Sequence, residues 1–208
     1  VGANSITITA TGPSKTYGTA LSAGTSATNF TVTGTLASGE TITSVTLTPN
    51  AAGLSSTTAA GTSYVGTPSA ATGAGGFLAS NYNITYTAFN GTVSQKALTI
   101  TANNTTKPYG TTQSTPVSGS TAFTSSGLVG SETIGSVTLT YGSGALTATA
   151  AVGSTSSITP GTATGGTFTA SNYSITYVSG TLTVGANSIT ITATGPSKTY
   201  GTALSAGT

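Results

Sequence analysis

The chain has 208 residues and almost no charge, because lysine, arginine, aspartate and glutamate make up only 3% of it, against about 25% in a typical globular domain. A net charge of +2 is too small and dispersed to attract nucleic acid or an anionic membrane surface. Cysteine, histidine and aspartate are absent, which removes disulfides and the usual zinc and calcium ligands. We therefore expect no cofactor and no metal. No apolar run approaches the roughly 18 residues of a membrane span, so we expect no membrane insertion.

Alternation of apolar and hydroxylated side chains predicts strands throughout residues 1–95. In the first strand, for example, Ile6 and Ile8 alternate with Thr7 and Thr9. Such a pattern is typical of an antiparallel strand with one buried face. The expected strands are Ser5–Ala10, Asn29–Leu36, Thr41–Thr48, Ser63–Ser69, Asn81–Thr87 and Gly91–Ser94, with a seventh short piece near Leu54–Thr58.

The same pattern returns in residues 96–185. Its expected strands are Leu98–Ala102, Thr121–Leu128, Thr133–Thr140, Ser157–Pro160, Asn172–Tyr177 and Gly180–Val184. Clusters of glycine, serine, asparagine and proline between the strands indicate turns. Residues 186–208 are expected to form the opening strand and turn of a third module.

Internal repetition explains this organisation. Val1–Thr25 recurs without one substitution at Val184–Thr208, which is 183 residues later (184 − 1). A weaker repeat divides this unit into two modules of about 91 residues, a common size for a small domain. We therefore expect the chain to be a segment of a tandem array, in which length is built by repetition.

Six or seven short strands per module predict an all-β, immunoglobulin-like antiparallel sandwich. A β-grasp-like module is the alternative, although no stretch is suited to form its helix. Tyr82 and Tyr173 precede the penultimate strands, where a tyrosine often ties its hydroxyl to the backbone. Tyr17-Gly18 follows the first strand and is expected to plug the module and turn the chain.

Catalysis is not expected, because each module has a single carboxylate and no histidine to act as a base. A lysine, a glutamate and an asparagine recur in each module and are candidates for a Lys–Asn isopeptide bond assisted by an acid. These residues are Lys15, Glu40 and Asn81 in the first module and Lys107, Glu132 and Asn172 in the second. Tyr64, Phe77 and Tyr141, aromatic residues without an evident counterpart in the other module, are the candidate ligand contacts. The alternative for each of these residues is an ordinary structural role.

The recurring motifs resemble a known family. They are Lys15, Tyr17 and Gly18 after the first strand, Gly39-Glu40 before a central strand, and Ser80–Tyr86 and Gly91–Val93 at the end of the module. Their counterparts are Lys107, Tyr109 and Gly110, then Glu132, Ser171–Tyr177 and Gly180–Val184. This set resembles the MBG-type repeat domain (YGX type) of giant bacterial surface adhesins, which implies a secreted surface stalk without catalytic residues.

We therefore expect a stiff extracellular stalk or fibre at the cell surface, with adjacent copies of the repeat as partners and glycans or surfaces met through distal regions. The alternatives are a carbohydrate- or surface-binding module and a self-assembling fibre subunit joined by strand donation. A lone strand cannot bury its apolar face or pair its backbone. Contacts from outside the chain are therefore expected to hold Val184–Thr208.

Overall fold

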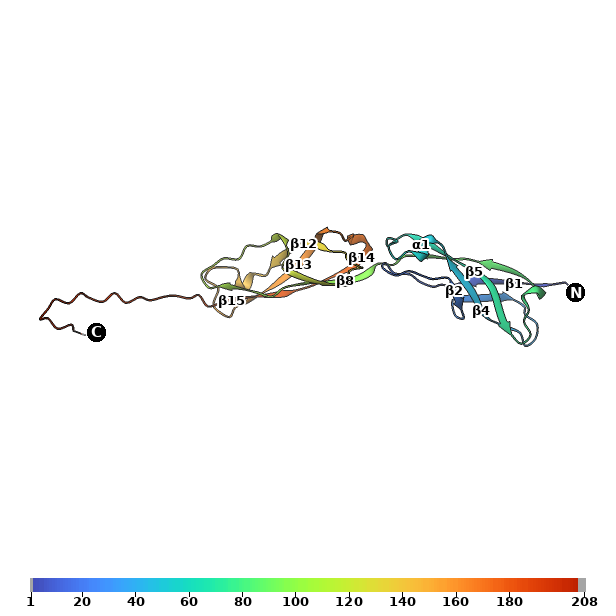
Figure 1. Ribbon diagram of the computed structural model, residues 1–208, viewed down its shortest axis with the longest axis horizontal. Coiled ribbons are helices and arrows are strands. Elements are labelled where there is room, and N and C mark those ends of the chain that lie inside the picture. The colour runs from blue at the N-terminus through green and yellow to red at the C-terminus, as the bar shows by residue number, and fades with distance from the viewer. Residues whose placement is uncertain (1, 206–208) are drawn as a thin grey trace.

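The computed structural model describes residues 2–205 and is built almost entirely from β-strands. Two modules lie end to end along the long axis of the molecule, and the residues after the second module continue outward as an extended tail (Figure 1). None of the helices formed by the described residues is long and apolar enough to cross a membrane.

Module one consists of two sheets and two short helical turns. Its strands are β1 (Asn4–Ala10), β2 (Gly24–Ser26), β3 (Phe30–Gly34), β4 (Thr41–Pro49), β5 (Ser63–Ala74), β6 (Tyr82–Thr87) and β7 (Phe89–Thr92). The helical turns are α1 (Ala51–Leu54) and the 3-10 turn η1 (Ala79–Asn81). The strand orders are β3-β1-β6 in one sheet and β2-β4-β5-β7 in the other.

Module two repeats this plan with one more strand. Its strands are β8 (Lys96–Ala102), β9 (Thr105–Pro108), β10 (Val117–Ser120), β11 (Phe123–Ser126), β12 (Ile134–Tyr141), β13 (Thr155–Gly166), β14 (Tyr173–Val178) and β15 (Gly180–Gly185). Two 3-10 turns, η2 (Ser143–Ala145) and η3 (Ala170–Asn172), complete it. The sheets have the orders β11-β8-β14 and β10-β12-β13-β15-β9.

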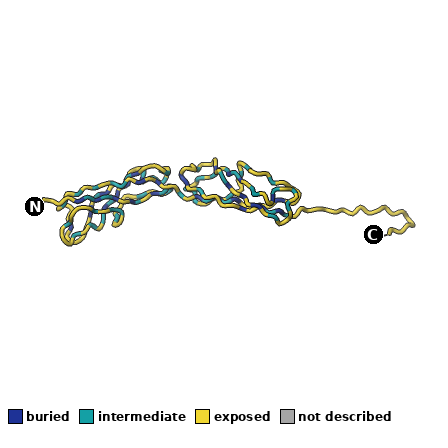
Figure 2. The backbone as a smooth tube through the Cα atoms, turned by 180° about the vertical axis from the view of Figure 1, so that it is seen from behind, coloured by how far each residue is buried: buried dark blue, intermediate teal, exposed yellow. Residues whose placement is uncertain are grey.

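The core of each module lies between its two sheets. Ile6 and Ile8 of β1 share one buried cluster with Val45 and Leu47 of β4, so the apolar faces of the two sheets meet. In module two, Leu98 of β8 shares a second buried cluster with Leu139 of β12, and this cluster continues into module one through Tyr17 and Tyr64. Figure 2 shows buried positions recurring along both modules. The predicted all-β sandwich is confirmed.

Strand direction differs from the expectation of an antiparallel sandwich. β1 pairs with β6 in parallel, with Ile6 opposite Ile84, and β8 pairs with β14 in the same way. Alternation shows which face of a strand is buried, but it carries no information on which strand lies beside it or in which direction. β9 also runs parallel to its neighbour β15, and an isolated parallel bridge between Thr16 and Ser94 holds the corresponding place in module one.

Several short elements differ from the predicted set. The piece near Leu54–Thr58 is not a strand: α1 begins after Asn50, whose side chain accepts a hydrogen bond from the Gly53 amide at 3.0 Å, and turns follow. β2, β9 and β10 were not predicted. Each has only three or four residues, which is too short for alternation to be recognised.

The tail after module two forms no strand within residues 186–205. Ile189 and Ile191 are 81% and 87% exposed, whereas their sequence counterparts Ile6 and Ile8 are 2% and 0% exposed. The tail therefore does not pack against module two, and Figure 2 shows it exposed along its length. That contacts from outside hold this segment stays a prediction, and residues 206–208 lie outside the described residues.

Candidate functional site: the junction between the modules

Tyr17 stands at the end of module one that faces module two. Its amide donates to the carbonyl of Ser94 at 2.9 Å, next to the bridge between Thr16 and Ser94. Gly18 follows with φ of +87°, a conformation that glycine adopts without steric cost, and its amide donates to the carbonyl of Ser56 at 3.0 Å. These bonds fix the turn that presents the Tyr17 side chain, so the expected role of Gly18 in turning the chain is confirmed.

A buried lysine supports this turn. Lys15 is 2% exposed, and its ammonium donates to the carbonyls of Gly53, at 3.0 Å, and of Ser55. Burial lowers the pKa of Lys15, because the charged form loses solvation. The two carbonyls belong to the end of α1 and the residue after it. The lysine therefore ties the segment that leads into the Tyr17 turn to the neighbouring loop.

Lys107 does the same in module two. It is 5% exposed, and its ammonium donates to the carbonyls of Thr111 at 2.7 Å and Thr147 at 2.9 Å. Thr147 occupies the place that Ser55 has in module one. Each recurring lysine is thus a structural link between loops at one end of its module.

A tyrosine and a glutamate form the opposite end of each module. The hydroxyl of Tyr173 accepts a hydrogen bond from the Val129 amide at 2.9 Å and donates to Oε2 of Glu132. In module one, Tyr82 accepts from the Ala37 amide at 2.9 Å and donates to Glu40. The predicted backbone tether of the corner tyrosine is confirmed in both modules, while its carboxylate partner was not predicted.

The two ends meet at the junction. The Tyr17 hydroxyl donates to Oε1 of Glu132 at 2.5 Å, so this carboxylate accepts from one tyrosine of each module. The ring of Tyr17 lies edge-on to that of Tyr173, with centroids 5.5 Å apart and planes at 81°. A β-carbon at Gly18 would lie 2.5 Å from Cγ2 of Val129, so the backbone of module one touches module two closely.

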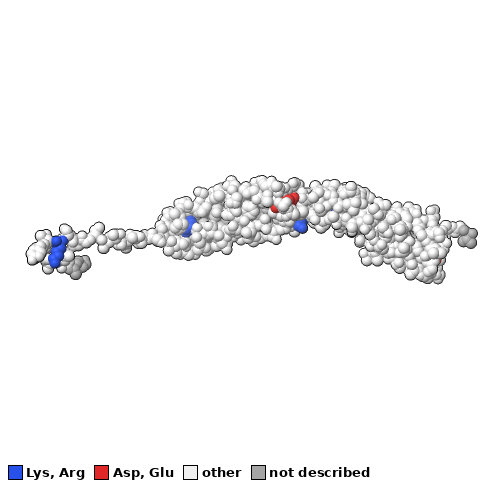
Figure 3. Space-filling view, viewed as in Figure 1, with Lys and Arg blue, Asp and Glu red and all other residues white. Residues whose placement is uncertain are grey.

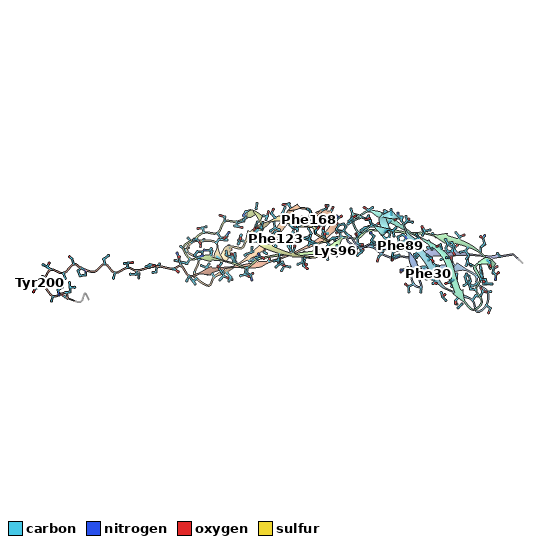
Figure 4. All side chains as sticks on the ribbon, viewed as in Figure 1. Phe30, Phe89, Lys96, Phe123, Phe168 and Tyr200 are labelled. Carbon is cyan, nitrogen blue, oxygen red and sulfur yellow. The ribbon has the colours of Figure 1, made fainter. Side chains whose placement is uncertain are left out.

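Two more hydrogen bonds cross the junction at its rim. The amide of Ala60 donates to Oδ1 of Asn172 at 3.0 Å, and Nε2 of Gln95 donates to the carbonyl of Ser171 at 3.0 Å. Asn172 is only 6% exposed. Figure 4 labels Lys96, the first residue of β8, where the two modules meet. The junction therefore combines an aromatic contact, a shared carboxylate and direct bonds to the backbone.

The phenols of the junction are held in their neutral, hydrogen-bond-donating form. Burial, followed by the hydrogen bond to Glu132, raises the pKa of Tyr173 to about 12. The hydrogen bond to Glu132, followed by burial, raises the pKa of Tyr17. Both tyrosines thus serve as donors to one carboxylate.

The structure does not bring the isopeptide candidates together. Lys15 lies at the junction end of module one, bonded to carbonyls, whereas Glu40 and Asn81 line a hollow at the opposite end with Gly2 and Tyr82. In module two, Lys107 bonds to the carbonyls of Thr111 and Thr147, whereas Glu132 and Asn172 contact module one across the junction.

Two of the three candidate ligand contacts, Tyr64 and Phe77, require a correction. Tyr64 is 1% exposed and Phe77 is 8% exposed, so both belong to the core, while Tyr141 is half-buried. Phe77 stacks on Tyr82, with centroids 5.4 Å apart, and Phe168 packs against Tyr173 in the corresponding place. Phe77 therefore has a counterpart that was not recognised from the sequence.

Tyr64 lacks a repeated counterpart because two core positions exchange size between the modules. Tyr64 pairs with Gly91 across β5 and β7, and Ser156 pairs with Leu182 at the same place in module two. A β-carbon at Gly91 would lie 2.4 Å from Cζ of Tyr64, so the large residue needs the small partner. The absence of a second tyrosine at this position therefore reflects compensating side-chain sizes in the core and does not indicate a surface site.

The chemistry offered by the described residues is hydrogen bonding and packing. Within residues 2–205, no group of three or more histidine, cysteine, aspartate or glutamate side chains could hold a metal ion. Charged side chains are sparse on the face drawn in Figure 3. The junction is therefore suited to hold two modules in a fixed relation.

The role of Tyr17 at this junction was missed in the sequence, where it was interpreted as a plug within its own module. The sequence signal for this contact was that a tyrosine and a glutamate recur together in both modules, as Tyr17 and Glu40 and as Tyr109 and Glu132. That recurrence does not say that the tyrosine of one module meets the glutamate of the next.

Comparison with known proteins gives one family. The chain matches the MBG domain (YGX type) at residues 6–94 and 98–183, which correspond to the two modules. No curated protein and no solved structure gives a match.

Proposed function

Because the chain belongs to the MBG domain (YGX type) family, we propose that it is a structural repeat of a secreted bacterial surface adhesin that forms a stiff, extended stalk. In this role the modules hold a distal binding region away from the cell, and the chain itself has no catalytic task. Its place is outside the cell, at the cell surface. The nearly uncharged composition without cysteine or methionine suits an exposed, oxidising setting.

One observation carries this proposal: Tyr17 of module one is bonded to Glu132 and packed on Tyr173 of module two. Only residues 93–95 separate β7 from β8, and Gln95 among them is itself bonded across the junction. A linker of this length with its own contacts leaves little freedom for a hinge. A series of such junctions would give a rod.

Stiffness can be tested by small-angle X-ray scattering on tandem proteins of increasing length. The maximum dimension should grow in proportion to the number of modules, whereas growth with its square root would contradict a rod. Tyr17→Ala should broaden the distribution of distances between the modules. Both variants are measured in the single two-module chain, where Tyr109 is 45% exposed; Tyr109→Ala is the matched control there and should leave the distribution unchanged.

The location needs a separate test. Antibodies raised against the purified chain should label intact, unpermeabilised cells of the source bacterium. Labelling that appears only after permeabilisation would contradict a surface stalk.

A second candidate function is a fibre subunit joined by strand donation between separate chains. It is supported by Ile189 and Ile191, which lie exposed in the tail although the same sequence forms the buried face of β1. In that case the purified chain should polymerise, and a chain that ends at residue 185 should not. A chain that stays monomeric at high concentration would favour the stalk over this alternative.

A further inference from the structure

Both outer ends of the two-module unit carry the groups that form the junction inside it. Module one presents Ala37, Glu40, Asn81 and Tyr82 at its outer end, which correspond to Val129, Glu132, Asn172 and Tyr173 of the junction. We call these four residues of module one the head. Module two presents Tyr109, Gly110 and Val152 at its outer end, which correspond to Tyr17, Gly18 and Ala60. We call these three residues of module two the tail face.

The head is shaped for a partner but lacks one in the structure. Tyr82 and Glu40 are bonded to each other as Tyr173 and Glu132 are. Oε1 of Glu40, however, receives no hydrogen bond from any of the described residues, whereas Oε1 of Glu132 accepts from Tyr17.

The residues of the head are less buried than their counterparts in the junction. Asn81 is exposed and Tyr82 half-buried, whereas Asn172 and Tyr173 are 6% and 2% exposed. Asn172 and Tyr173 are less exposed because module one covers them at the junction.

The tail face has the same backbone conformation as the Tyr17 turn of module one, but no module in the described part of the chain covers it. The Tyr109 amide donates to the carbonyl of Gly185 at 2.8 Å, and the Gly110 amide to that of Ala148 at 3.0 Å, as the amides of Tyr17 and Gly18 do in module one. Gly110 also has a φ of +91°.

Exposure again marks the difference between the two faces. Tyr109 is 45% exposed, whereas Tyr17 is 5% exposed. Val152 is 57% exposed at the place where the amide of Ala60 reaches Asn172. The tail face thus exposes a tyrosine and a valine whose counterparts, Tyr17 and Ala60, contact module two at the junction.

We propose that the tail face of one unit binds the head of a second copy, through Tyr109 to Glu40 and Tyr82 and through the Val152 amide to Asn81. The occupant follows from the repeat: residues 184–208 have the sequence of residues 1–25, so the opening strand of a module one follows module two. The tail leaves module two from β15, beside Tyr109, and Figure 4 labels Tyr200 far along it. This inference rests on the proposed stalk and names the contact that would join its units.

The test uses a tandem protein in which residues 1–183 are followed directly by residues 1–208. It contains one joint between units, made by Tyr109 of the first copy and Glu40 of the second. Tyr109→Phe in the first copy and Glu40→Gln in the second are measured singly and together by chemical denaturation. Each single change should lower the equilibrium constant for folding about tenfold, the size expected for a hydrogen bond to a charged group. The double change should cost little more than either alone.

The tandem protein supplies matched controls of identical chemistry. Glu40→Gln in the first copy and Tyr109→Phe in the second lie at free ends. Tyr109→Phe there should change the constant less than about twofold, and Glu40→Gln should cost only its bond with Tyr82, which the same change at the joint loses as well. Equal effects at the joint and at the free ends, or additive effects of the double change, would overturn the inferred contact.

If the contact fails while the scattering dimension still grows in proportion to module number, the stalk stands and its units are joined in another way. If the coupling is present but the dimension does not grow in that manner, the contact stands and the stiff stalk fails.

Discussion

The phenolic hydroxyl of Tyr17 in module one lies 2.5 Å from Oε1 of Glu132 in module two. The two residues are far apart in the sequence and belong to different modules, yet one carboxylate accepts from Tyr17 and from Tyr173 of its own module. A single carboxylate therefore links the two modules. The two phenols are the side chains that donate to this carboxylate among the described residues.

We expect Tyr17→Phe to reduce the stability of the chain by about 1.5–3 kcal/mol, because the bond it removes is to a charged group. Glu132→Gln should have a similar effect, and the double variant should cost less than the sum of the two, since both belong to one interaction. Urea denaturation measures all three. Tyr109→Phe is the control, because Tyr109 is 45% exposed in the single chain, and its cost should stay within about 0.5 kcal/mol. A loss at Tyr17 no greater than at Tyr109 would show that the junction contributes nothing.

The sequence predicted the strands well where alternation was long and regular, as in β1 and β4. It also predicted the backbone tether of Tyr82 and Tyr173, because this tether depends on the position of the tyrosine next to the penultimate strand, which can be recognised in the local sequence. The parallel pairing of β1 with β6 could not be predicted, because alternation places a residue on a face and says nothing of its neighbours. The junction was missed for a related reason: a contact between modules leaves no local pattern in either one.

The candidate sites show a second limit. Tyr64 was interpreted as a surface contact because module two has no tyrosine at that place. Its partner Gly91 shows the reason, since the pair exchanges size with Ser156 and Leu182. Only the paired register reveals such compensation.

Lys15→Ala should destabilise module one by about 2 kcal/mol or more, because the carbonyls of Gly53 and Ser55 would lose their donor inside the protein. Thermal unfolding followed by circular dichroism measures this. Lys198 offers a control in an identical stretch of sequence, since it lies exposed in the tail, and Lys198→Ala should change stability by less than about 0.5 kcal/mol. Equal, small effects at both positions would contradict a structural role for the buried ammonium.

Stability should fall as the pH rises from about 10 toward about 12. The pKa of Tyr173 is raised in the folded chain from its ordinary value of 10.0 to about 12, so the folded state keeps a proton that the unfolded state releases in this range. The stabilisation is therefore fully present below about pH 10 and is lost as the pH passes through the folded pKa. Denaturation midpoints over this range should fall more steeply for the native chain than for Tyr173→Phe. Parallel curves would show that the phenol titrates as it does in water.

Trypsin should cut the folded chain first and almost exclusively after Lys198. Lys15 and Lys107 are buried, and Lys96 is half-buried in β8 beside the junction, whereas Lys198 lies in the exposed tail. Cleavage at a folded site requires local opening, so its rate reports the population of the open form. Mass spectrometry should therefore find a lasting fragment that ends at Lys198.

Tyr17→Ala should loosen the junction and expose Lys96 to cleavage, while Tyr109→Ala should not. Rapid cleavage after Lys96 in the native chain would mean that the junction opens freely, and the stiff stalk would then have no structural basis.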